Sequence, residues 1–111
     1  MTEAKHVWNT VASTDAVGTE APLEVVVGNA LVILVRTGDG IAAFQGNCPH
    51  QFARLGGGMI VDGRIRCPHH RADFSLTDGT CGPGWILPAL KRYAVRVEDG
   101  QVLLPDPLIE L

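Results

Sequence analysis

The chain has 111 residues, of which 46% are hydrophobic and 19% are charged, so it is long enough for one domain with a modest core. Its net charge of -3 and isoelectric point near 5.7 argue against a nucleic-acid-binding protein, because no basic stripe is present to neutralise phosphates. Residues 1–6 contain no apolar signal core, and no apolar run is long enough to cross a bilayer. These features predict a cytoplasmic protein.

Short β-branched segments separated by tight-turn pairs predict an antiparallel β-sheet. Residues 23–27 and 31–36 lie on either side of Gly28-Asn29, and residues 41–45 form a third candidate strand. Asp-Gly pairs, which favour hairpin turns, occur at residues 39–40, 62–63, 78–79 and 99–100. Because no segment shows sustained helical periodicity, the predicted fold class is all-β.

The C-terminal part of the chain continues this pattern. Apolar residues alternate with polar or small ones around the turn at residues 99–100: Tyr93, Val95 and Val97 before it, Val102 and Leu104 after it. The alternation predicts that this part of the antiparallel sheet is half-buried.

Two short motifs contain cysteine and histidine at spacings that suit an iron–sulfur cluster. Cys48 and His50 form the first motif, Cys67 and His70 form the second, and residues 51–66 lie between them. A [2Fe–2S] cluster would then have both thiolates on one iron and both imidazoles on the other. Two neutral imidazoles raise the reduction potential and place a titratable group on the redox-active iron. The motifs therefore predict electron transfer coupled to proton binding.

Both motifs are expected at the tips of loops. The first follows the strand that ends near Gln45, and the second follows a hairpin formed by residues 59–61 and 64–66. Pro49 and Pro68 come directly after the two cysteines and fix the backbone angle φ there, which limits the freedom of each loop.

The two motifs resemble those of the Rieske iron–sulfur family, and in particular those of its ferredoxins. In this chain Cys-x-His is separated from Cys-x-x-His by residues 51–66. The resemblance covers roughly residues 40–104. It continues through Asp73-Phe74-Ser75-Leu76, Asp78-Gly79, Gly82-Pro83-Gly84, Leu87-Pro88-Ala89 and residues 93–100. Arg71 is a departure, because family members usually have Gly after the second ligand histidine; it affects the expected backbone conformation and not the ligation.

The resemblance implies a fold and a cofactor. The fold would be a single Rieske domain over residues 1–111, with an antiparallel β-sandwich base at about residues 1–45 and 87–111. An inserted subdomain at about residues 46–86 would bind the cluster, and Gly82-Pro83-Gly84-Trp85 would be the proline-containing loop that shields it. The cofactor would be one Rieske-type [2Fe–2S] cluster, with these cofactor-binding and metal-binding residues: Cys48, His50, Cys67 and His70.

The resemblance also implies a low reduction potential. High-potential family members have a disulfide between the two ligand loops, and the corresponding positions here are Ala53 and His69. Those members also place a Ser and a Tyr hydroxyl near the cluster, where this chain has Ala72 and Phe74. Because hydrogen bonds to sulfur stabilise the more negative reduced state, their loss lowers the midpoint, to roughly -150 mV.

The function implied is that of an electron carrier, not an enzyme. A flavoprotein ferredoxin reductase that uses NAD(P)H would supply single electrons, and a terminal aromatic-ring-hydroxylating oxygenase would receive them. The carrier would be a monomer in isolation, with no nucleic-acid or membrane partner. An oxygenase itself needs a second iron held by two histidines and a carboxylate, whereas only His6 and His69 remain after the four ligands. We therefore expect no catalytic oxygenase domain.

Several alternatives remain open from the sequence. The same four ligands could hold a structural zinc, His69 could replace His70, and the chain could be a Rieske-like small subunit of an enzyme such as assimilatory nitrite reductase. Cys81 is expected to be partly buried in the loop that covers the cluster, and Trp8 and Trp85 to pack rather than relay electrons.

The charged residues near the motifs suggest where a partner binds. Arg54 and Arg71 could steer an electron partner, or be surface residues or ion-pair partners of Asp73. The negative net charge weakly favours a basic surface on that partner.

Overall fold

The computed structural model describes residues 5–38, 40–49, 54–68, 73–82 and 88–111. These residues form ten β-strands and two 3₁₀ helices, η1 (Thr14–Ala16) and η2 (Leu55–Gly57), without an α-helix. The predicted all-β fold class is therefore confirmed. No helix in the described part of the chain is long and apolar enough to span a membrane.

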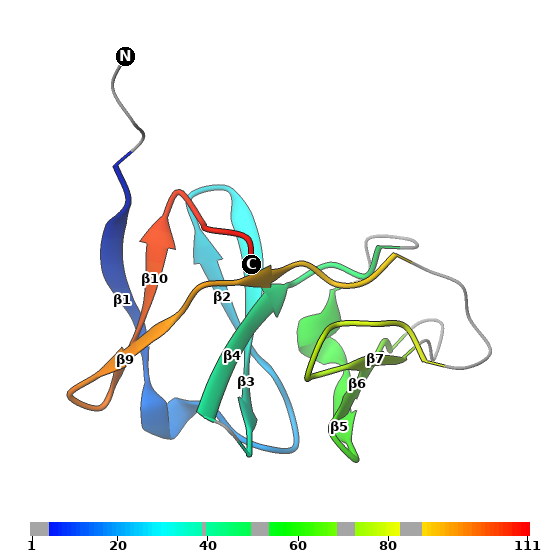
Figure 1. Cartoon of the computed structure of the whole chain (residues 1–111). Coiled ribbons are helices and arrows are strands. Elements are labelled where there is room, and N and C mark those ends of the chain that lie inside the picture. Colours follow the sequence, from blue (N-terminus) through cyan, green and yellow to red (C-terminus); the bar gives the residue numbers. More distant parts are fainter. Residues whose placement is uncertain (1–4, 39, 50–53, 69–72, 83–87) are drawn as a thin grey trace.

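A four-stranded antiparallel sheet, here called the central sheet, has the order β2-β3-β4-β8 (Figure 1). Its strands are β2 (Leu23–Val27), β3 (Ala30–Thr37), β4 (Gly40–Gln45) and β8 (Arg92–Tyr93). The turn between β2 and β3 lies at Gly28-Asn29, and Gly28 has a φ of 59°, which glycine adopts readily. The three strands predicted between residues 23 and 45 are confirmed to within one residue.

A second sheet, the terminal sheet, pairs the two ends of the chain. Its order is β1-β10-β9, with β1 (Val7–Ser13), β10 (Gln101–Asp106) and β9 (Arg96–Glu98). β1 was not predicted because the pairing register shifts between Thr10 and Ala12, which interrupts the alternation of inward and outward side chains. Trp8 is half-buried, with the Arg96 guanidinium 4.0 Å from its ring centroid, so it packs as expected.

The predicted alternation holds in β10 but not throughout the strand before it. Val102 and Leu104 are fully buried, whereas Val97 is 50% exposed although it lies directly opposite Val102. β9 is the edge strand of the terminal sheet, and all three of its residues are exposed. The half-buried assignment is therefore wrong for Val97.

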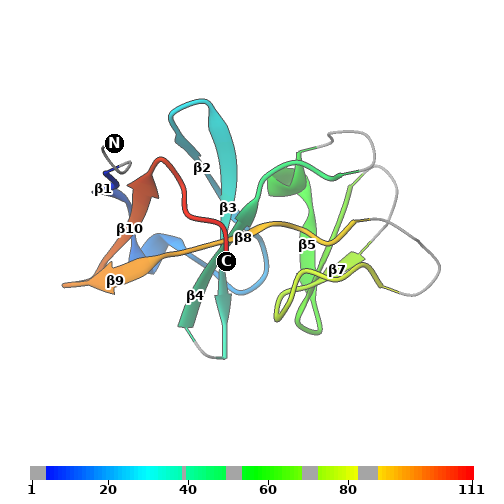
Figure 2. The same cartoon turned by 45° about the horizontal axis from the view of Figure 1, so that its top comes forward.

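The third sheet, called the hairpin sheet, has the order β5-β6-β7 and lies apart from the terminal sheet (Figures 1 and 2). Its strands are β5 (Met59–Val61), β6 (Arg64–Arg66) and β7 (Asp73–Ser75). The turn residues Asp62 and Gly63 have φ values of 52° and 72°, both positive as a tight primed turn requires. The β5–β6 hairpin is confirmed residue for residue.

The central sheet separates two hydrophobic cores. Alternate residues of β3 and β4 face opposite sides, so β3 is a continuous apolar run rather than an alternating one. On the side of the hairpin sheet, the first core contains Ile33, Val35, Ala42, Phe44, Cys48, Leu55, Ile65, Cys67, Phe74, Leu76 and Leu90. On the side of the terminal sheet, the second core contains Val17, Val27, Val32, Leu34, Ala43, Val102 and Leu104.

Candidate metal centre

Two of the four predicted ligands lie together in the first core. Cys48 follows β4 after two residues, and Cys67 follows β6 directly. Both are 0% exposed, and Leu55, Ile65 and Phe74 belong to the same cluster of buried side chains. The cysteines form no disulfide with each other. Two thiols in one water-excluded apolar environment fit the thiolate side of a [2Fe–2S] cluster.

The other predicted ligands lie outside the described residues. These are His50 and His70, together with the competing His69 and the neighbouring positions Ala53, Arg71, Ala72 and Trp85. Within the described part of the chain, no three His, Cys, Asp or Glu side chains are grouped as a metal site. The full ligand set therefore stays a prediction. Of its four members, the structure places the two cysteines, Cys48 and Cys67, in the first core.

Backbone hydrogen bonds close the base of the first ligand loop. Gly46 N donates to Leu31 O at 2.9 Å, and Leu55 N donates to Gly46 O at 2.8 Å. Asn47 and Arg54 form an antiparallel bridge just outside the loop segment. The two ends of the loop are thus held side by side at the end of β4.

Gln45 connects this loop base to a segment far along the chain. Its backbone N donates to Lys91 O at 2.9 Å, and its side-chain Oε1 accepts a hydrogen bond from Lys91 N at 2.8 Å. Its Nε2 donates to Asn47 O at 2.7 Å, one residue before Cys48. Sequence reasoning missed this role, because a polar residue at a strand end carries no distinctive signal.

Arg54 is exposed and forms an ion pair with Glu24 of β2. Its Nε donates to Glu24 Oε1 at 3.0 Å, and this bond together with the charge of Glu24 holds the pKa of Arg54 above its ordinary value. The suggested pair between Arg54 and Asp73 is wrong. Asp73 instead accepts a hydrogen bond from Nε of Arg64 at 2.9 Å, because β6 and β7 are adjacent strands.

The Arg64–Asp73 pair supports the segment after β7. Gly82 N donates to Asp73 O at 2.6 Å, and a Cβ at position 82 would overlap both Asp73 Oδ1 and the Arg64 guanidinium. The backbone of Cys81 forms an antiparallel β-bridge with that of Phe74. The Cys81 side chain is partly buried, as predicted, and packs against the first core. A larger residue at position 82 would therefore have to displace the side chains of this ion pair.

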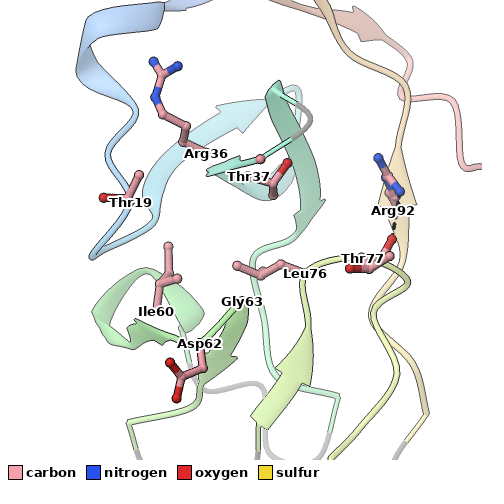
Figure 3. Close-up of a pocket in the computed structure, with 10 residues that line it drawn as sticks. Thr19, Arg36, Thr37, Ile60, Asp62, Gly63, Leu76, Thr77 and Arg92 are labelled. Carbon is pink, nitrogen blue, oxygen red and sulfur yellow. Dashed lines mark hydrogen bonds between the residues drawn. The ribbon is translucent and has the colours of Figure 1, made fainter.

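A cleft of about 530 Å³ lies between the central sheet and the hairpin sheet (Figure 3). Ile60 and Leu76 line it on the hairpin side. Its two arginines donate to backbone carbonyls: Arg36 Nε to Val17 O at 2.9 Å, and Arg92 to Thr77 O at 2.9 Å. These bonds connect neighbouring segments, so we assign the cleft a structural role.

Comparison with known proteins places the chain in a family. The model of the Rieske [2Fe-2S] domain matches residues 7–96. The chain is 32% identical over 105 residues to the ferredoxin subunit of anthranilate 1,2-dioxygenase from Burkholderia cepacia, with 92% of this chain and 95% of the subunit covered. It is 30% identical over 105 residues to the chloroplastic protein TIC 55 of Arabidopsis thaliana, where it covers 86% of its own length and only 19% of the relative.

Solved structures agree with this assignment. The ferredoxin of carbazole 1,9a-dioxygenase from Nocardioides aromaticivorans IC177 superposes with a TM-score of 0.78 at 25% identity, covering 96% of this chain and 98% of that one. A complex of reduced oxygenase and oxidized ferredoxin in carbazole 1,9a-dioxygenase gives 0.76 at 26% identity, covering 85% and 97%. A putative NADH-dependent nitrite reductase small subunit from Mycobacterium tuberculosis gives 0.74 at 23% identity over 92% and 96%, a likeness of fold alone. The chain belongs to the Rieske [2Fe–2S] domain family and is an electron-transfer component with one Rieske-type cluster.

Proposed function

We propose that the chain is a low-potential Rieske ferredoxin that carries single electrons to a terminal aromatic-ring-hydroxylating oxygenase. The carrying observation is its similarity, over nearly the full length of both chains, to the ferredoxin subunit of anthranilate 1,2-dioxygenase. The solved complex of an oxygenase with a ferredoxin supports an oxygenase as the acceptor. The nitrite reductase alternative has only a likeness of fold in its favour.

The electron donor in this proposal is a flavin-containing reductase that uses NAD(P)H. The reason is chemical: a one-electron carrier needs a donor that divides the two electrons of a hydride, and a flavin does this. A cytoplasmic location and a monomeric state in isolation complete the proposal. Size-exclusion chromatography with light scattering tests the monomer directly.

The proposed ligands are Cys48 and Cys67 on one iron and His50 and His70 on the other. When bound, the cluster supplies reversible storage of one electron. The protein excludes water from the thiolates through the apolar side chains of the first core. It also holds the first ligand loop closed through the hydrogen bond from Leu55 N to Gly46 O. Both contributions limit the reorganisation that accompanies electron transfer.

The low potential is supported by Phe74. This residue stands where high-potential relatives have a tyrosine, and it is fully buried in the same core as Cys48 and Cys67. A phenyl ring has no hydroxyl to donate to sulfur, and an apolar environment disfavours the more negative reduced state. Both effects lower the midpoint.

The division into a base and a cluster-binding subdomain at about residues 46–86 remains part of the proposal. It is supported by the hairpin sheet, whose three strands all fall within residues 46–86, while the other two sheets use strands outside that range. The first core contains residues from both parts, so the subdomain packs directly against the central sheet of the base.

A reductive titration of protein purified without oxygen tests the function. Visible absorption and low-temperature EPR should show a red-brown protein with the rhombic signal of a histidine-ligated [2Fe–2S] centre, and a midpoint near -150 mV. A midpoint well above zero would contradict the low-potential assignment. A colourless protein with one bound zinc would contradict the electron-carrier function and indicate a structural module instead.

A further inference from the structure

Charged residues are distributed very unevenly along the chain. Residues 46–92 carry six Arg or Lys and three Asp, a net charge of +3, whereas the remaining residues carry three Arg or Lys and nine Asp or Glu, a net charge of -6. The two parts together give the -3 of the whole chain. A cluster with two thiolates and two neutral imidazoles is formally neutral when oxidised and singly negative when reduced, so it does not cancel the positive part.

For the two outer sheets this separation along the sequence is also a separation in space, whereas Glu24 of the negative part pairs with Arg54 of the positive part. The hairpin sheet lies within the positive part and is set apart from the terminal sheet, which belongs to the negative part (Figures 1 and 2). The molecule measures 43 × 35 × 20 Å. Its long dimension is several times the Debye length of about 10 Å at 0.1 M salt, so the acidic end is largely screened from the opposite end.

Arg66 is the cation best placed to contact a partner. It is the last residue of β6, directly before Cys67, and it is exposed. The ion pairs among the described residues involve Arg54 and Arg64 but not Arg66. Asp73 lies opposite Arg66 in the β6–β7 pair, but its carboxylate pairs with Arg64, so the charge of Arg66 is available to a carboxylate from outside.

A hollow beside Arg66 supplies an apolar contact. Met59 lies opposite Arg66 in the β5–β6 pair and is 62% exposed. The hollow, which we call the Arg66 hollow, measures about 480 Å³ and is lined by Gly57, Gly58, Met59, Arg66, Cys67 and Pro68. It adjoins Cys67, so a partner seated there would be close to the proposed cluster.

We propose that the Arg66 hollow docks onto an acidic surface of the oxygenase that accepts the electron. The inference rests on the proposed function, because it requires such an acceptor. The proposed charge of the partner surface is opposite to the one expected from the net charge of the whole chain, because a net charge of -3 favours a basic partner. The local charge decides, because fields at a docking surface act over about one Debye length and steer the encounter. Met59 and Pro68 would add apolar contact around the ion pair formed by Arg66.

Two probe proteins of opposite charge test the sign. The reduced holoprotein is mixed in a stopped-flow instrument with cytochrome b5, which is acidic, or with cytochrome c, which is basic. Each cytochrome takes one electron, so the cluster is oxidised as the haem iron is reduced. Raising salt from about 10 to 300 mM should slow transfer to cytochrome b5 about tenfold and should not slow transfer to cytochrome c.

Variants with the same change in charge locate the surface. Arg66→Glu should remove most of the salt dependence with cytochrome b5, whereas Lys5→Glu, at an exposed site near the N-terminus, should leave it intact. Arg66→Gln, a smaller change in charge at the same position, serves if Arg66→Glu fails to assemble the cluster, and Lys5→Gln is then its control. Visible absorption confirms the cluster content of each variant.

Three outcomes would overturn the proposal. These are a reversed salt dependence for the two cytochromes, an Arg66→Glu protein that behaves like wild type, or a Lys5→Glu protein that loses the effect. Failure of the proposed function has a different signature, because a protein without a reducible cluster would transfer no electron to either cytochrome.

Discussion

Gln45 shows how one side chain can organise the candidate site. It joins Asn47, at the start of the first ligand loop, to Lys91, which follows the predicted proline-containing loop at residues 82–85. Gln45→Glu keeps the acceptor for Lys91 N but replaces the donor to Asn47 O with a carboxylate that repels the carbonyl. We expect the free energy of unfolding to fall by about 1–2 kcal/mol and the visible absorption of the cluster to bleach several times faster in urea.

Gln101→Glu provides the matched control for this change. Gln101 lies in β10 and accepts a hydrogen bond from Thr10 at 3.1 Å, which a carboxylate can also accept. Its cluster should bleach at the wild-type rate. Equal rates for the two variants would show that the Gln45 contacts do not stabilise the ligand loop.

The two histidines of the second motif differ in their predicted roles. His70→Ala should abolish the native EPR signal and visible spectrum, because it removes an iron ligand in the proposed set. His69→Ala is the neighbouring control and should leave both spectra largely intact. If His69→Ala abolished the spectra and His70→Ala left them intact, His69 rather than His70 would be the iron ligand.

At the scale of elements, the turn after β7 is fixed by close backbone contact. Gly79 has a φ of 79°, and a Cβ there would lie 2.6 Å from Leu90 O, while Leu90 N donates to Gly79 O at 2.9 Å. Gly79→Ala should therefore lower the free energy of unfolding by about 3 kcal/mol. Gly100→Ala shares the positive φ, 76°, but meets nothing within 4 Å, so it should lose only about 1 kcal/mol. Equal losses in urea titrations would mean that the Leu90 contact is not maintained.

Asp78 stabilises the same turn in a pH-dependent way. Its Oδ1 accepts hydrogen bonds from Thr80 N at 3.0 Å and Thr80 Oγ1 at 2.7 Å, and these bonds hold the pKa of Asp78 below its usual 3.8. A lowered folded-state pKa means that the stabilisation is present above about pH 4 and is lost as the pH falls through the folded pKa. Asp78→Asn should therefore differ from wild type in urea midpoint at pH 7 and approach it as the pH falls below about 4 and through the folded-state pKa. A difference that does not change with pH would exclude the carboxylate as its cause.

At the scale of the whole molecule, two cores share the central sheet but only one contains the cysteines. Cys48 and Cys67 belong to the first core, and the second core is built from other residues. Removal of the cluster should therefore loosen the hairpin sheet while the terminal sheet stays folded. Hydrogen exchange of holoprotein and apoprotein should show loss of protection in β5, β6 and β7 and retention in β1 and β10. Loss of protection throughout would mean that the two cores unfold as one unit.

The sequence by itself determined the β architecture and the chemistry of the cluster. Tight turns such as Gly28-Asn29 and Asp62-Gly63 have local backbone requirements, so the hairpins around them could be predicted to within a residue. The spacing of the Cys and His motifs is also local, and the family assignment it suggested is confirmed. Its ligand roles stay a prediction.

Contacts between distant segments were decided only by the tertiary structure. β1 is paired by β10 at the other end of the chain, and Glu24, rather than the nearby Asp73, is the partner of Arg54. The hydrogen bond between Gln45 and Lys91 and the exposure of Arg66 likewise depend on which segments of the chain pack against each other. A sequence specifies local backbone preferences residue by residue, whereas pairing and burial depend on the packing of the whole chain, and this is why these features were not predictable.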